Sequence, residues 1–173
     1  QDKNLDFLLE VYKRIVRKNP CVNLIFAGDG PYLATLKERA NGLERVIFTG
    51  ALKHELMPDI YSGADIFVFP SSTDTFGMAV IEAQACGLPA IVSNLGGPQE
   101  IIKNGITGYV VSTNRIIDWQ DEIEQLIELK IKNPKRFLAM KEAARNNALH
   151  DSSWDAVLRE IAGETMGQEK QNS

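Results

Sequence analysis

Apolar side chains recur every three or four positions near the start of the chain. They stand at Leu5, Leu8, Leu9, Tyr12, Ile15 and Val16. This spacing predicts an amphipathic helix over 5–18, which Asn19 and Pro20 bring to an end. The next apolar run, 22–27, is too short for a helix and is followed by Gly28, so it predicts a buried strand.

The alternation of a helical segment with a short apolar run continues to residue 111. The expected helices cover 31–40, 54–61 (interrupted near Pro58) and 76–86, and the expected strands cover 45–49, 66–69, 89–93 and 107–111. Strands separated by helices form a parallel sheet with helices on both of its faces. The pattern therefore predicts an α/β fold with a doubly wound, Rossmann-like sheet.

Beyond residue 111 the pattern predicts helices only, over 116–132, 134–149 and 153–162. The end of the chain, 163–173, is polar and lacks apolar periodicity, so we expect a disordered tail there. A length of 173 residues is sufficient for one substantial core. Since no repeat or linker interrupts the chain before the tail, we expect 1–162 to form a single domain.

Composition narrows the classes of function. The chain is 44% hydrophobic and 24% charged, and its net charge is −4. Since no cluster of Lys and Arg offsets this charge, we expect no nucleic-acid partner. No apolar run reaches the length of a membrane span, and Cys21 and Cys86 lack metal-ligand spacing. We expect a cytoplasmic protein with buried thiols and no bound metal.

The segment 64–111 contains a strand-to-helix turn suited to holding a ligand. An apolar run gives way to the polar loop 71–75, and Phe76 opens the next helical segment. The hydroxyls and carboxylate of this loop can cap the helix. We expect uncapped N–H groups near Gly77 and Met78 to attract an anion at the positive end of the helix.

Asp74 and Glu82 raise the question of an acid–base pair. If both lay on one helix, a separation of eight residues would place them roughly 12 Å apart. The paired carboxylates of glycosidases stand about 5 to 9.5 Å apart. The spacing therefore disfavours shared bond cleavage and favours two contacts along an extended ligand. The structural alternative is that Asp74 caps the helix and Glu82 is a solvated helix residue.

Two glycines, Gly28 and Gly30, follow the first predicted strand and suggest a turn that binds a dinucleotide. The third glycine of the G-x-G-x-x-G fingerprint would fall on Leu33, and no acidic residue lies within 50–53 to hold a ribose. A phosphate contact and a plain structural turn are therefore both open at this position.

Four motifs within 64–111 occur together in one known family. They are Asp74-Thr-Phe-Gly77, Glu82-Ala83, Cys86-Gly-Leu-Pro89 and Gly96-Gly97-Pro-Gln-Glu100. In these motifs the chain resembles the nucleotide-sugar half of retaining glycosyltransferases with the GT-B fold, in glycosyltransferase family 4, or glycosyl transferases group 1. The chain departs from the family pattern at Asp74, where most members have Glu.

The resemblance implies that the chain binds a UDP- or GDP-linked hexose, with no cofactor and no metal, for transfer to a lipid or glycan acceptor. Asp74 and Glu82 would be the catalytic residues, with Asp74 on the donor sugar and Glu82 on the ribose. Lys3 matches a lysine that reaches the diphosphate in the family. The donor-binding residues would be Lys3, Gly28, Gly30, Val46, Phe48, Phe76, Gly77, Met78, Gly96 and Gly97.

The resemblance covers 1–162, which would be the nucleotide-sugar (donor) binding domain. The arginine that accompanies the family's lysine would fall before Gln1, so we expect that an acceptor-binding N-terminal domain is absent from this chain. The isolated domain should then be inactive, and the whole enzyme could lie at the periphery of a membrane that carries its acceptor lipid. Two alternatives stay open: an NAD-type dinucleotide-binding oxidoreductase domain, and a noncatalytic α/β interaction or regulatory domain.

Overall fold

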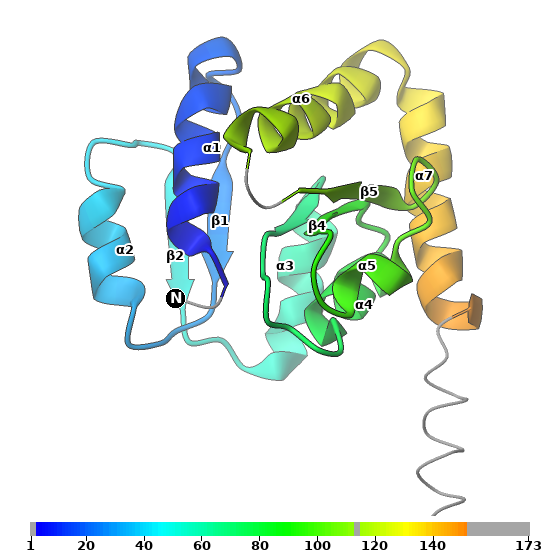
Figure 1. The fold of residues 1–173 in the computed structure, drawn as a ribbon, viewed down its shortest axis with the longest axis horizontal. Coiled ribbons are helices and arrows are strands. Elements are labelled where there is room, and N and C mark those ends of the chain that lie inside the picture. The colour runs from blue at the N-terminus through cyan, green and yellow to red at the C-terminus, as the bar shows by residue number, and fades with distance from the viewer. Residues whose placement is uncertain (1–2, 113–114, 152–173) are drawn as a thin grey trace, which may run out of the picture.

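Helices and strands alternate along the chain in the computed structural model, which describes residues 3–112 and 115–151 (Figure 1). The first half contains α1 (Leu5–Lys18), β1 (Leu24–Ala27), α2 (Leu33–Arg39), β2 (Val46–Gly50), the 3-10 turn η1 (His54–Leu56), α3 (Met57–Gly63) and β3 (Phe67–Phe69). The second half contains α4 (Met78–Ala85), β4 (Ala90–Ser93), α5 (Pro98–Ile101), β5 (Gly108–Val111), α6 (Ile116–Lys132), α7 (Pro134–Asn146) and the π-helical turn η2 (Asn147–Asp151). The predicted helix over 153–162 and the tail 163–173 lie outside the described residues.

Every pair of neighbouring strands in the described part is parallel, as the alternating pattern predicts. The strands form two sheets, of order β1-β2 and β3-β4-β5. The register places Leu24 opposite Val46 in the first sheet. In the second sheet Ala90 lies opposite both Phe67 and Gly108, so β4 is the central strand.

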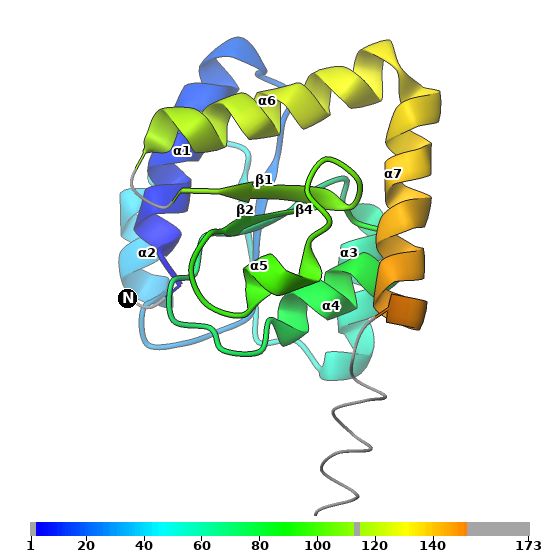
Figure 2. The same ribbon diagram turned by 45° about the vertical axis from the view of Figure 1, so that its right-hand side comes forward.

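The sheet that contains β4 is covered by helices on both faces, and alternate residues of β4 supply both cores. Ile91 packs with Trp119 and Leu126 of α6 in one cluster, which Val11 of α1 also joins. Ala90 and Val92 belong to a second cluster with Val80 of α4. Figure 2 shows the result, with α6 on one side of β4 and β5 and with α4 and α5 on the other. This arrangement confirms the doubly wound α/β fold.

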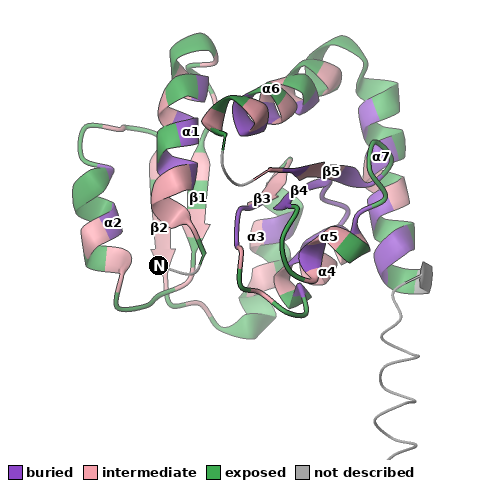
Figure 3. Cartoon of the chain, viewed as in Figure 1, coloured by how far each residue is buried: buried purple, intermediate pink, exposed green. Residues whose placement is uncertain are grey.

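The sheet of β1 and β2 is covered on one face. Leu24, Phe26, Val46 and Phe48 pack against Leu9 of α1 and Leu36 of α2. On the opposite face, Ile25 and Ile47 lie side by side in the register and keep 38% and 46% of their surface exposed. Figure 3 shows the contrast, since all of β4 and both ends of β5 are buried whereas β1 and β2 are intermediate or exposed.

The expected start of one helix and the expected burial of the two thiols need correction. Helix α4 begins at Met78 and not at Phe76, because Gly77 adopts a left-handed conformation (φ 66°, ψ 29°) that a continuing helix cannot contain. Cys21 is exposed, and Cys86 is partly exposed. Cys21 follows Pro20 in a turn before β1, outside the apolar run that was expected to bury it.

Candidate functional site

The candidate site consists of the loops that follow the carboxyl ends of the strands. In parallel sheets these ends lie along one edge, which is where α/β proteins bind their ligands. Gly28 follows β1, Gly50 ends β2, and Pro70 and Asn94 follow β3 and β4. Gly28 and Gly50 also form an isolated bridge. The predicted glycines, Asp74 and the start of α4 therefore belong to loops at strand ends.

The loop after β3 is bonded both to the end of β4 and to the loop that follows it. The hydroxyl of Ser93 donates to the carbonyl oxygen of Ser71. The N–H of Gly97 donates to the carbonyl oxygen of Asp74 at 3.1 Å. A β-carbon at Gly96 would overlap the carbonyl oxygen of Asp74, and one at Gly97 would overlap that of Thr75. Both glycines thus allow the loop after β4 to lie close against the loop after β3. Their contact with the donor, which the resemblance implies, stays a prediction.

Asp74 uses one of its carboxylate oxygens to shape the turn before α4. Its Oδ1 accepts hydrogen bonds from the backbone N–H of Phe76 (3.1 Å) and of Gly77 (2.6 Å). Gly77 N–H is therefore occupied, contrary to the expectation that it is uncapped. No hydrogen bond to Oδ2 is recorded within the described residues, so this oxygen can meet a ligand.

The first turn of α4 presents backbone donors and apolar side chains. Within residues 3–112 and 115–151 no acceptor is recorded for the N–H groups of Met78 and Ala79, which point towards the helix N-terminus. Phe76 and Met78 have exposed fractions of 66% and 47%, and Leu95 of the neighbouring loop has 44%. An anion and an apolar group can both be accommodated here.

Glu82 lies on α4 and is held from α3. Its Oε2 accepts a hydrogen bond from the hydroxyl of Tyr61 at 3.3 Å, and its Oε1 lies 3.9 Å from Nε2 of the exposed His54. Burial raises the pKa of Tyr61 above its usual value, and the neighbouring Glu82 carboxylate raises it further. Tyr61 therefore stays protonated and serves as a donor. The Glu82 side chain remains 32% exposed and is open to a ligand.

Buried polar groups hold α4 from its other side. Gln84 is fully buried and donates to the carbonyl oxygen of Thr107 at 3.2 Å. Asn147 donates to Gln84 Oε1 at 3.0 Å and to the carbonyl oxygen of Ile101 at 2.8 Å. Since a buried amide is costly to leave unpaired, this network fixes α4, and with it Glu82, against α5 and η2.

The loop after β1 is tied both to β2 and to α1. Gly28 N–H donates to the hydroxyl of Thr49 at 3.2 Å. Tyr32 donates its hydroxyl proton to Asp6, which also pairs with Arg39 at 2.9 Å. Gly28 and Gly30 have open space where a β-carbon would stand, so a ligand could approach them. Their contact with phosphate stays a prediction.

Val46 and Phe48 lie in the core of the β1-β2 sheet. Phe48 stacks on Phe26 with 5.4 Å between ring centres, and Lys37 lies 5.8 Å from its ring. Both residues pack in the cluster beneath α1 and α2. These are the positions of core residues in the expected strand 45–49. The donor contact that the resemblance implies for Val46 and Phe48 stays a prediction.

Sequence reasoning missed several residues that organise these loops. Asn4 donates from Nδ2 to the carbonyl oxygen of Pro70 at 2.9 Å and so connects the exposed Lys3 with the loop after β3. Three hydroxyl groups on strands and helices also form hydrogen bonds that hold the loops or Glu82. They belong to Thr49, Tyr61 and Ser93. A single polar residue in such an element carries no pattern that could have identified it.

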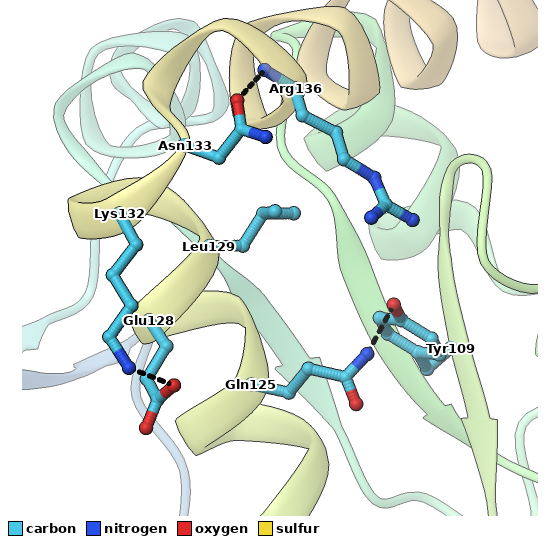
Figure 4. Close-up of a pocket in the computed structure, with 7 residues that line it drawn as sticks. All are labelled: Tyr109, Gln125, Glu128, Leu129, Lys132, Asn133 and Arg136. Atoms are coloured by element: carbon cyan, nitrogen blue, oxygen red, sulfur yellow. Dashed lines mark hydrogen bonds and ion pairs between the residues drawn. The ribbon is translucent and has the colours of Figure 1, made fainter.

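Two surface hollows lie away from these loops. One, of about 320 Å³, lies between α6, α7 and β5 (Figure 4). Four of its polar side chains are bonded in pairs, by the 2.8 Å bonds from Gln125 to Tyr109 and from Lys132 to Glu128. The other, of about 360 Å³, is lined by Arg14, Arg17, Lys18 and Gln120. Neither hollow is lined by a residue of the strand-end loops, so the candidate site is the group of loops and not one of these hollows.

The described part of the chain lacks both a metal-binding cluster and a membrane-spanning helix. Its His, Cys, Asp and Glu side chains form no group of three or more that could hold a metal ion. None of its helices combines the length and apolar character needed to span a bilayer.

A doubly wound domain with glycine-rich and acidic loops at its strand ends defines the class of nucleotide-binding α/β domains. Comparison with known proteins identifies the family. The family model described as "Glycosyl transferases group 1" matches residues 1–147. The chain belongs to this family and corresponds to the C-terminal domain of its GT-B fold.

Curated relatives from a plant and a bacterium have similar sequences. A sulfoquinovosyl transferase of Arabidopsis thaliana is 32% identical over 159 residues, covering 90% of this chain and 30% of the relative. A GDP-mannose-dependent α-(1-6)-phosphatidylinositol monomannoside mannosyltransferase of Mycolicibacterium smegmatis is 32% identical, with coverage of 88% and 41%. The chain thus spans well under half of the length of these relatives.

Solved structures share the fold. Sucrose-phosphate synthase of Thermosynechococcus elongatus matches 99% of this chain with a TM-score of 0.80 and 25% identity, over 43% of its own length. The Anabaena protein HepE, solved in complex with UDP-glucose, matches 96% of this chain with a TM-score of 0.80 and 23% identity, over 46% of its length. These matches agree with the arrangement of parallel strands and helices described above.

Proposed function

We propose that this chain is the donor-binding part of a retaining glycosyltransferase that takes a hexose from a UDP- or GDP-linked sugar. The observation that carries the proposal is the turn before α4 together with that helix. Asp74, the free backbone N–H groups of the first turn and Glu82 follow one another there along the chain. An extended ligand with a sugar, a diphosphate and a ribose offers one group to each of them. A GDP-mannose-dependent relative and a UDP-glucose complex of a structural neighbour support this ligand class.

In this proposal the protein meets the charge of the leaving diphosphate without a metal. The N–H groups of Met78 and Ala79 and the ammonium of Lys3 would stabilise the negative charge that develops as the sugar departs. Asp74 Oδ2 would accept from hydroxyls of the donor sugar, and Glu82 would accept from the ribose hydroxyls. Gly96 and Gly97 contribute by holding the loop after β4 against Asp74 and Thr75.

A binding panel tests the proposal against its alternatives. UDP, GDP, UDP-glucose, GDP-mannose and NAD would each be titrated calorimetrically into the full-length protein. We expect either UDP or GDP to bind together with its sugar, and NAD not to bind. Preferential binding of NAD would favour the oxidoreductase alternative, and binding of none of the five would favour a noncatalytic interaction domain.

The 173-residue chain by itself should bind a nucleoside diphosphate but transfer no sugar. The reason is that the acceptor site is proposed to lie in the remainder of a longer protein, so that the reacting groups cannot be brought together. Transfer of radiolabelled sugar by the 173-residue chain would be compared with transfer by the full-length protein, using the same acceptors. Equal turnover by the two would contradict the assignment of the chain as a half-site.

Replacing Glu82 with Ala should weaken UDP or GDP binding by about 1.5 to 3 kcal/mol, the usual range for hydrogen bonds to a charged group. Calorimetry on the variant measures this loss, and the melting temperature reports on the fold. Glu142→Ala, which removes an exposed carboxylate from α7, is the matched control and should leave affinity unchanged. Unchanged affinity in Glu82→Ala with normal melting would remove Glu82 from the site.

A further inference from the structure

Asn4 has an unusual backbone conformation at the start of α1. With φ 50° and ψ 38°, it lies in the left-handed region, and within residues 3–112 and 115–151 no other residue except glycine has a positive φ. Asparagine tolerates this region better than most residues, but glycine tolerates it best. A conformation of this kind indicates that the surrounding structure imposes it.

The side chain of Asn4 does not do what an asparagine at the start of a helix usually does. Such a residue ordinarily accepts a hydrogen bond from the first turn of its own helix. In this protein no such cap is formed, although the backbone carbonyl of Asn4 still accepts from Leu8 N–H at 3.1 Å. The amide instead donates across the molecule to Pro70, 66 residues further along the chain.

Pro70 is buried and leads directly into the loop that contains Asp74. That loop is bonded in turn to the loop after β4, through Ser93 and Gly97. The bond from Asn4 therefore adds the segment before α1 to the same group of connected loops. Lys3, which is exposed, is the neighbour of the residue that makes this connection.

We propose that Asn4 is a positioning residue that orients Lys3 towards the diphosphate of the nucleotide ligand, an inference that rests on the proposed function. The left-handed backbone turns the chain between Lys3 and α1, and the bond to Pro70 fixes that turn beside the Asp74 loop. Lys3 would then stay beside the loop that leads from Pro70 through Asp74 to the start of α4, where a diphosphate would lie.

The test is a double-mutant cycle in the full-length protein, with Asn4→Gly, Lys3→Ala and the double variant. Glycine keeps the left-handed backbone and removes only the side-chain bond. We expect Asn4→Gly to weaken binding of whichever of UDP and GDP the protein binds by about fivefold, the value of one typical hydrogen bond. The affinity for UMP or GMP, which lack the second phosphate, should stay the same.

Because Asn4 is proposed to act through Lys3, the double variant should bind the diphosphate no more weakly than Lys3→Ala alone. Asn41→Gly, a change in an exposed turn, controls for the effect of adding a glycine. Equal losses for the mono- and diphosphate, additive losses in the cycle, or no loss at all would each overturn the inference. If the unaltered protein binds neither UDP nor GDP, the proposed function itself is wrong. That outcome differs from a failure of the inference about Asn4, in which the unaltered protein binds the nucleotide.

Discussion

Replacing Gly97 with Ala should destabilise the protein by about 3 kcal/mol, at the upper end of the usual cost of overpacking. Gly97 has φ −69° and ψ −30°, a conformation that alanine adopts readily, so no backbone strain is involved. The added methyl would overlap the carbonyl oxygen of Thr75, which belongs to the backbone of the neighbouring loop and cannot rotate away. The two loops would have to separate, and the bond from Gly97 N–H to Asp74 would be lost.

Urea denaturation of the variant and the parent protein measures this effect, with the midpoint reporting stability and the slope reporting the surface exposed on unfolding. Gly63→Ala is the matched control, since this glycine ends α3 with ordinary backbone angles and open space around it. The control should be neutral or slightly stabilising. If Gly97→Ala unfolds at the same urea concentration as the parent, the loops tolerate separation and Gly97 is not a packing requirement.

The helices that the sequence predicts best are those whose apolar stripe faces a large core. The predicted bounds of α1 and α6 agree with the structure, because their periodic residues pack in the cluster around Trp119 and Ile91. The parallel arrangement follows from the alternation of strands and helices. The division of the strands into two sheets could not be predicted, because hydrophobic pattern fixes which residues are buried but not which strand edges pair.

The loops were predicted less well for a physical reason. Glycine at 96 and 97 is equally compatible with approach of a ligand and approach of another backbone, and only the positions of Asp74 and Thr75 distinguish the two. The left-handed Asn4 depends on a partner 66 residues away, which local sequence cannot indicate. Asp74 illustrates a third case, because its Oδ1 caps the turn before α4 and the proposed contact with the donor sugar would use Oδ2.

Replacing Asp74 with Asn in the full-length protein should lower sugar transfer on the order of a hundredfold, while leaving the affinity for free UDP or GDP nearly unchanged. Asparagine keeps Oδ1, which can still accept from Phe76 and Gly77, so the turn before α4 should be preserved. What changes is the second oxygen, since an uncharged NH₂ group replaces the carboxylate oxygen proposed to hold hydroxyls of the donor sugar. The loss should therefore concern the sugar and the transition state, not the nucleotide.

The companion variant Asp74→Glu restores the residue that most members of the family have, yet it should also be slower than the parent. One added methylene moves the carboxylate outwards, and a misplacement of about 1 Å can cost a hundredfold in rate. The longer side chain must also accept from Gly77 N–H, whose nitrogen lies 2.6 Å from Asp74 Oδ1 in the parent protein. Transfer rates, calorimetric nucleotide affinity and melting temperature would be measured for both variants. Transfer by Asp74→Asn at the rate of the parent would leave Asp74 as a capping residue alone, and equal losses in transfer and nucleotide affinity would place its contact on the nucleotide.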